Sequence, residues 1–97
     1  TQSLAKEVGQ YNINVNAICP GLVDTERVDF IAAALANSGE SGAEYRAEMI
    51  QERSTIVPLG RVAQGEDIAN TAAFLCSNES DYLTGLSISV SGGSEMN

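Results

Sequence analysis

The sequence predicts an α/β fold, in which helices and strands follow one another within a single domain. Two segments alternate apolar with polar side chains, as strands do. Four others carry apolar residues at helical spacing or are rich in helix-favouring residues. The expected strands cover residues 13–19 and 86–90, and the expected helices cover 1–8, 28–35, 41–53 and 66–76.

The first strand is defined by its alternation and by its end. Apolar side chains occupy every second position from Ile13 to Cys19, and Asn14 and Asn16 lie between them. Pro20 has no backbone N–H, so it is expected to stop the strand. If the face that carries the two asparagines is covered, their amides need hydrogen-bond partners, which polar loops or helix ends are expected to supply.

The helices carry signals at their ends. Gly9 lies where the first helix is expected to stop, and the Asn-Ser-Gly run at 37–39 is expected to close the second. Ser41 and Glu44 have the spacing of a capping box, in which the hydroxyl accepts a backbone N–H and the carboxylate reaches back. This pattern predicts a helix that runs through about Arg53.

Composition excludes several classes of function. The 97 residues are 43% hydrophobic and 19% charged, which argues against disorder. The net charge is −8 with five basic residues, so a nucleic acid is an unsuitable partner. No apolar stretch approaches the roughly 20 residues that span a bilayer, so we expect no membrane insertion and a cytoplasmic location.

Metal and disulfide chemistry are not expected either. The chain has no histidine, and Cys19 and Cys76 are far apart with no CxxC spacing. We therefore expect no metal site, and we expect both cysteines to be reduced and buried as small apolar side chains.

The end of the first strand is the candidate binding site. In open α/β sheets ligands lie outside the carboxyl ends of the strands, which is where Pro20 and Gly21 follow the apolar alternation. We expect Gly21 to leave open space beside the chain. The backbone groups of Val23 and the hydroxyl of Thr25 would then meet a ligand. The alternative interpretation is an ordinary Pro-Gly turn with no ligand.

Four motifs follow one another in a fixed order along the chain. They are Ser3-Leu4-Ala5-Lys6-Glu7, Asn16-Ala17-Ile18-Cys19-Pro20-Gly21, Pro58-Leu59-Gly60-Arg61 with Asp67-Ile68-Ala69, and Tyr82-Leu83-Thr84-Gly85 running to Gly92-Gly93. In this order they resemble the C-terminal part of the short-chain dehydrogenase/reductase family, and the resemblance spans nearly the whole chain. It implies that residues 1–97 are the C-terminal portion of one Rossmann-like, doubly wound parallel sheet with a helical substrate lid at about 25–58.

The resemblance also implies roles for the strand-end residues. Pro20 and Gly21 would face a nicotinamide ring, and Val23 would offer its main-chain N–H and C=O to the carboxamide. Thr25 would hydrogen-bond the carboxamide or the pyrophosphate, although it could also cap the following helix. Val28 would line the substrate pocket, and the alternative is that it packs within a helix pair.

Arg61 and Asp67 are typical of the family as well. A surface ion pair or a carboxylate at a helix start explains them without any catalytic duty, so they are left out of the site.

The family's catalytic half has no counterpart in these residues. The glycine-rich cofactor loop is absent, and no tyrosine is followed four residues later by lysine. We therefore expect no catalytic residue here, a longer protein that begins upstream of Thr1, and an inactive isolated chain.

Two functional hypotheses follow. The first is an NAD- or NADP-dependent oxidoreductase that interconverts a small secondary alcohol and a ketone, and that assembles as a homotetramer or homodimer, as the resemblance implies. The second is a non-catalytic truncated relative that acts as a self-associating or scaffold protein.

Overall fold

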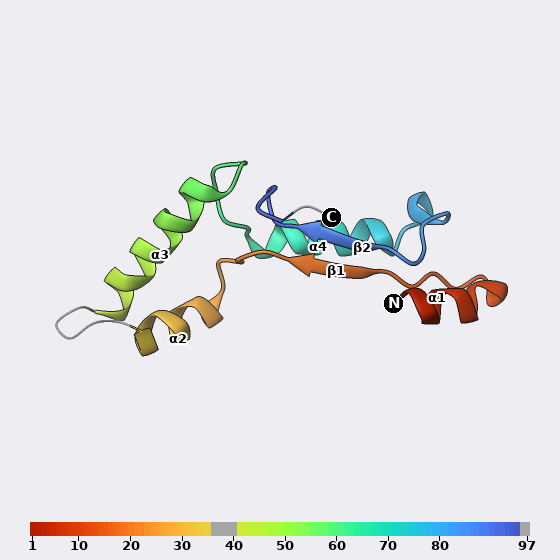
Figure 1. Cartoon of the computed structure of the whole chain (residues 1–97), viewed down its shortest axis with the longest axis horizontal. Coiled ribbons are helices and arrows are strands. Elements are labelled where there is room, and N and C mark those ends of the chain that lie inside the picture. The colour runs from red at the N-terminus through yellow and green to blue at the C-terminus, as the bar shows by residue number, and fades with distance from the viewer. Residues whose placement is uncertain (36–40, 96–97) are drawn as a thin grey trace.

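The computed structural model describes residues 1–35 and 41–95, which form an elongated molecule (Figure 1). The two strands and four helices that the sequence predicts are present among these residues, and the α/β class is confirmed. In chain order the elements are α1 (Gln2–Val8), the 3-10 turn η1 (Gly9–Tyr11), β1 (Ala17–Pro20), α2 (Glu26–Leu35), α3 (Gly42–Ile56), α4 (Gly65–Leu75), the 3-10 turn η2 (Asn78–Ser80) and β2 (Ser87–Val90).

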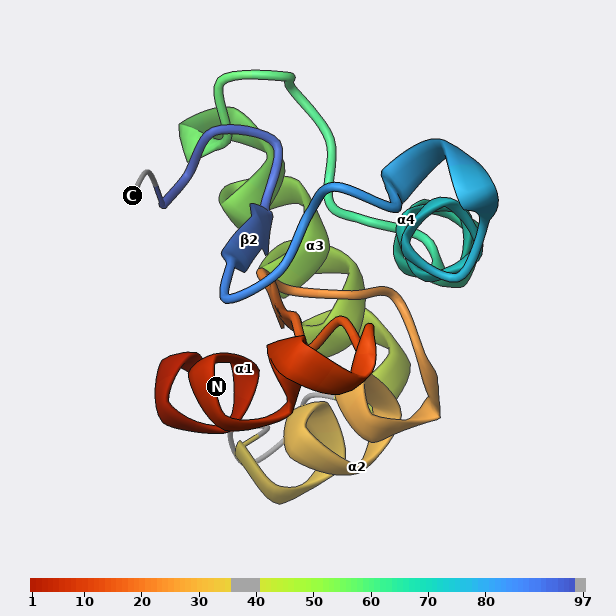
Figure 2. The ribbon, with the colours of Figure 1, turned by 90° about the vertical axis from the view of Figure 1, so that its right-hand side faces the viewer.

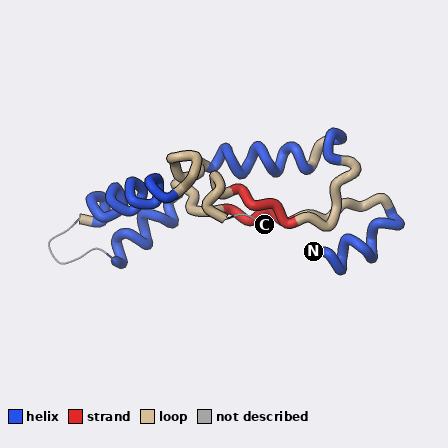
Figure 3. The backbone as a smooth tube through the Cα atoms, turned by 45° about the horizontal axis from the view of Figure 1, so that its top comes forward, coloured by secondary structure: helices blue, strands red, loops and turns tan. Residues whose placement is uncertain are grey.

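The two strands pair in parallel, with Ala17 opposite Ser87 and Pro20 opposite Val90. A parallel pair needs a crossover connection, and here the crossover runs through α2, α3 and α4 (Figure 3). Among the described elements, α4 packs against both strands, and the view along the molecule shows it beside β2 (Figure 2). The α2–α3 hairpin extends beyond the carboxyl end of β1 (Figure 1).

The prediction for the first strand needs two corrections. Its start is later than predicted, because the N–H of Val15 donates to the Thr84 hydroxyl and its C=O accepts from Gly85 instead of joining the ladder. Its end is later too, because Pro20 belongs to β1 and the N–H of Gly21 still donates to Val90, at 3.1 Å. Backbone groups alternate in direction, so the Pro20 nitrogen points away from β2 and costs the ladder no bond.

The two asparagines find partners in a polar loop, as predicted. The Asn14 amide donates to the carbonyl of Asp81 at 3.1 Å. The Asn16 amide donates to the carbonyl of Leu83 and its oxygen accepts from the N–H of Leu86, both at 3.1 Å. These bonds fasten the segment that leads into β2 to the segment that leads into β1.

The helix predicted after Ser41 is confirmed, and its cap is half of the predicted box. The Ser41 hydroxyl accepts from the N–H of Glu44 at 3.1 Å, and the helix continues past Arg53 to Ile56. The run at 37–39 that was expected to close α2 lies outside the described residues.

Close backbone packing joins the chain after α3 to the end of β2. Gly92 has a φ of +62°, and a Cβ built there would lie 2.7 Å from Cγ1 of Val57. The carbonyl of Gly92 also accepts from the N–H of Leu59 at 3.1 Å. The motif at 58–61 and the motif that ends at Gly92-Gly93 therefore pack against each other, because Gly92 has no side chain that would keep them apart.

The interior is small for a chain of this length. The radius of gyration is 17.2 Å, and the molecule measures 58 × 24 × 20 Å, whereas a compact domain of this size has a radius of about 12.5 Å. The accessible surface is 6866 Å², compared with about 5300 Å² for a folded monomer of the same mass. The buried apolar residues are Ala5, Val28, Ala32, Val57 and Val62.

The prediction that both cysteines are buried is wrong, since both are free and exposed. Ile18 lies with Ala72 and Leu75 on the face that α4 covers. Side chains alternate between the two faces of a strand, so Cys19 lies on the opposite face, which none of the described elements covers. Cys76 directly follows the last residue of α4.

No helix within residues 1–35 and 41–95 is both long and apolar enough to cross a membrane.

The open sheet leads to a prediction about the 97-residue chain produced alone. Its exposed strand edge and uncovered sheet face should make it self-associate and unfold without a cooperative transition. Sedimentation velocity and urea titration followed by circular dichroism measure both properties. A monomer with a single sharp unfolding transition would contradict this expectation.

Candidate functional site at the end of β1

The five residues that the sequence assigns to the site line one open hollow of about 350 Å³ at the carboxyl end of β1. We call it the strand-end hollow. It is formed by the last residue of β1, the loop that follows, and the first two turns of α2. Its lining residues are Pro20, Gly21, Leu22, Val23, Thr25, Arg27, Val28 and Ile31.

The main-chain N–H and C=O of Val23 pair with nothing in the described part of the chain. It forms an isolated parallel bridge with Ala63, in which Ala63 donates to the carbonyl of Leu22 at 3.1 Å and accepts from the N–H of Asp24 at 2.8 Å. In such a bridge the central residue turns its own N–H and C=O away from the partner. Among the described residues these two groups make no hydrogen bond, so a donor and an acceptor lie side by side at the hollow.

The Thr25 hydroxyl is available as well. The N–H of Val28 donates to the main-chain carbonyl of Thr25 at 3.0 Å, and the hydroxyl has no hydrogen-bond partner within the described part of the chain. The alternative in which this side chain caps α2 therefore finds no support in the contacts. Thr25 is exposed and can turn its hydroxyl toward a ligand.

Gly21 contributes differently from the sequence prediction. A Cβ built there would lie 3.1 Å from Cβ of Ser91 and 3.2 Å from its Cα, so the expected open space beside this glycine is occupied. The glycine lets the chain leaving β1 pass close to the chain leaving β2. Ser91 is buried there, and its hydroxyl donates to the carbonyl of Glu95 at 3.0 Å.

Val28 is packed as well as positioned at the hollow. Only 2% of it is exposed, and with the fully buried Ala32 it forms the inner face of α2. Most of the Val28 side chain is therefore buried within the helix pair, as the packing alternative expects. The lining of the hollow includes Val28 as well. Whether it touches a substrate stays a prediction.

A second hollow also borders Gly21 and Leu22, and it lies between the loop and α3. It has a volume of about 620 Å³, and its lining is mainly apolar. Met49 and Ile56 contribute to it from α3, and both lie within the range 25–58 that the family resemblance assigns to the lid. The lining residues are Gly21, Leu22, Met49, Glu52, Arg53 and Ile56.

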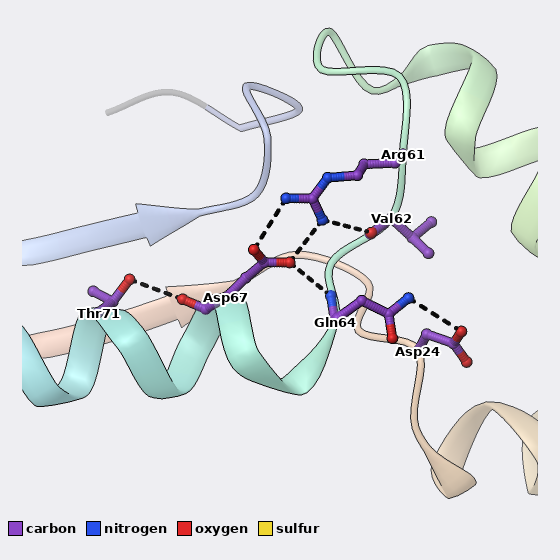
Figure 4. A network of polar contacts seen from close by, with 6 residues as sticks. All are labelled: Asp24, Arg61, Val62, Gln64, Asp67 and Thr71. Carbon is purple, nitrogen blue, oxygen red and sulfur yellow. Dashed lines mark hydrogen bonds and ion pairs between the residues drawn. The ribbon is translucent and has the colours of Figure 1, made fainter.

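Arg61 and Asp67 form the ion pair that the sequence suggests, and the carboxylate also stands at a helix start (Figure 4). Two hydrogen bonds of 2.7 and 3.0 Å join the two side chains, and the N–H of Gln64 donates to Asp67 at 2.8 Å. The Arg61 hydrogen bonds, with that N–H, lower the pKa of Asp67 to about 2.

The contact between Asp24 and Arg46 is one that the sequence does not reveal. Arg46, on α3, forms ion pairs with Asp24 in the loop and with Asp29 on α2. Asp24 also accepts from the Gln64 side chain at 3.4 Å. The two partners are 22 positions apart, so no local spacing rule identifies them, and only the fold of the α2–α3 hairpin brings them together.

The site is therefore suited to binding. It offers an amide-like donor and acceptor on Val23 and a hydroxyl on Thr25 beside apolar walls. Among the described residues no group of three or more metal-ligating side chains is gathered.

The model of a family described as enoyl-(acyl carrier protein) reductase matches residues 1–95. A 3-oxoacyl-(acyl-carrier-protein) reductase of Chlamydia muridarum is 42% identical over 93 residues, which are 96% of this chain and 32% of that protein. A diacetyl reductase of Staphylococcus epidermidis, (S)-acetoin forming, is 43% identical over 96 residues, which are 96% of this chain and 35% of that protein.

A solved structure has the same fold over this region. It is a short chain dehydrogenase family protein from Francisella tularensis, with a TM-score of 0.82 and 37% identity. The match covers 97% of this chain and 38% of that one. The chain thus spans about a third of the length of the curated relatives it matches.

The lowered pKa of Asp67 predicts how the free energy of unfolding of the gene product, meaning the protein as its gene encodes it, depends on pH. A carboxylate whose pKa is lower in the folded state contributes stability that is complete above its unfolded value of about 4 and is lost as the pH falls toward 2. Asp67→Asn should therefore lower the free energy of unfolding at pH 7, and the difference should shrink between pH 4 and pH 2. Urea unfolding at a series of pH values measures it. A difference that stays constant down to pH 2 would refute this assignment.

Proposed function

We propose, since this chain belongs to the short-chain dehydrogenase/reductase family, that it forms the nicotinamide-side loop and the substrate lid of an NAD- or NADP-dependent oxidoreductase. The reaction is the interconversion of a small secondary alcohol and a ketone, with hydride carried by the nicotinamide. The residues that transfer the proton lie outside the 97 residues. The lid comprises residues 25–58 within a single Rossmann-like domain.

The free backbone groups of Val23 are the observation that carries this proposal. A nicotinamide carboxamide has an NH₂ donor and a C=O acceptor on one rigid group, and Val23 presents the complementary acceptor and donor at the strand-end hollow. Two hydrogen bonds to one residue fix the orientation of the ring and so select the face that gives or receives hydride. The Thr25 hydroxyl supplies a further bond to the carboxamide or the pyrophosphate.

The substrate side of the proposal rests on the second hollow and on Val28. The mainly apolar lining of the second hollow suits a small ketone or alcohol, and the volume of this hollow falls in the range of small-molecule sites. The two similar reductases carry the names of different substrates, a 3-oxoacyl group on a carrier protein and diacetyl. We therefore propose a ketone substrate without choosing between these classes.

The oligomer in the proposal is a homodimer or homotetramer that uses the surface of α4 and β2. Three exposed apolar side chains support it, Phe74 in α4 and Tyr82 and Leu86 in the connection between α4 and β2. The same surface favours the second candidate, a self-associating relative without catalysis. The two differ in activity, because only the enzyme oxidises a reduced nicotinamide when a ketone is present.

The activity prediction uses the gene product with NADH, NADPH and a panel of small ketones. Val23→Pro removes the main-chain N–H and should raise the KM for the cofactor about three- to tenfold, the size of one lost hydrogen bond. Val23→Ala keeps the N–H and is the matched control, with a KM close to that of the unchanged protein. Equal KM values for the two variants would contradict the backbone role, and oxidation of neither cofactor would favour the scaffold candidate.

The Thr25 hydroxyl is tested separately. Thr25→Val preserves the side-chain shape but removes the hydroxyl, so the KM for the cofactor should rise a few-fold. Thr25→Ser retains the hydroxyl and should restore most of the affinity. If valine and serine behave alike, the hydroxyl makes no bond to the cofactor.

A further inference from the structure

We infer that Arg46 is a positioning residue for cofactor binding, because it ties the nicotinamide loop to the α2–α3 hairpin through Asp24. The inference rests on the proposed function and adds to it. Arg46 belongs to the lid and does not line the strand-end hollow. It helps to hold in place the backbone groups that do line the hollow.

The geometry places Arg46 between two elements. Its Nη2 pairs with Oδ1 of Asp24, and its Nε lies 2.5 Å from Oδ1 of Asp29 on α2. Asp24 stands between Val23 and Thr25, so the guanidinium acts on the backbone at the centre of the proposed cofactor contact. The hairpin that carries Arg46 begins where this loop ends (Figure 1).

Burial shows which of the two contacts is stronger. The side chains of Arg46 and Asp24 are 29% and 27% exposed, whereas that of Asp29 is 60% exposed. An exposed ion pair contributes little because water and salt screen it, and a partly buried charge-assisted bond contributes more. The Asp24 contact is therefore the one that matters for the loop.

Asp24 is also held from the opposite side, where α4 begins. Its N–H donates to Ala63 at 2.8 Å, and its Oδ2 accepts from the Gln64 side chain (Figure 4). The loop is thus held between the start of α4 and the lid helix α3. Removal of Arg46 leaves the α4 side in place and frees the α3 side, so the loop loses orientation without losing its attachment.

This arrangement couples the cofactor and the lid. A cofactor bound to Val23 and Thr25 orders the loop, and through Asp24 and Arg46 it orders the hairpin that lines the second hollow. Conversely, a loop that is already fixed binds without the entropic cost of ordering. A loop loosened at Asp24 but still held at Ala63 should therefore bind the cofactor more weakly without losing binding altogether.

The test measures the Kd of the gene product for NADH and NADPH by titration of cofactor fluorescence. Arg46→Met should raise the Kd roughly tenfold, about the size of one lost charge-assisted hydrogen bond. Asp29→Asn should change it less than threefold, as expected of an exposed pair. Lys6→Met is the control, since it removes a cation from α1, away from the loop and the hairpin, and its Kd should match that of the unchanged protein.

A double-mutant cycle separates positioning from general stability. In an Asp24→Asn background, Arg46→Met should change the Kd less than twofold, because its partner is already removed. Arg46→Lys retains the charge and the fold and should give an intermediate Kd. A Kd for both Arg46 variants equal to that of the unchanged protein, or fully additive effects in the cycle, would overturn the inference. If the unchanged protein binds neither cofactor, the proposed function fails first.

Discussion

The direction of the backbone between Ala17 and Asp24 is the constraint on which the site depends. Along this segment alternate residues turn their N–H and C=O groups toward a neighbour, first β2 and then Ala63. The residues between them turn the same groups the other way. Pro20 can belong to the strand for this reason, and Val23 is left with a free donor and acceptor at the hollow. One residue of slip would exchange these roles.

Side-chain interactions fix where this backbone lies and do not use the N–H and C=O groups of Val23. Asn14 and Asn16 join the segments that lead into the two strands. Gly21 lets the segment that leaves β1 pass within contact distance of Ser91, in the segment that leaves β2. Beyond the strand, Asp24 is held by groups from α3 and from the start of α4. These polar contacts hold the backbone in place, and within the described residues the groups suited to a ligand have no partner.

The same structure explains why the molecule is open. Its surface exceeds that of a compact domain of equal mass, and one sheet face is left uncovered by the described elements. The exposed cysteines and the exposed apolar residues of α4 and the following turn are consequences of that geometry. A doubly wound sheet covers both faces with helices, and α4 supplies the cover for one.

The sequence by itself determined the α/β class, the helices, the second strand and the family. Periodicity and end signals such as Ser41 are local, and they survive whatever surrounds them. The five proposed site residues line one hollow because they lie within nine consecutive positions at one strand end, and their roles remain a prediction from the family resemblance. Tertiary structure decided the rest: the true ends of β1, the neighbour that fills the space beside Gly21, the burial of Val28 and the meeting of Asp24 with Arg46. These depend on contacts between distant segments, and side-chain spacing along one segment carries no information about which distant segment will lie against it.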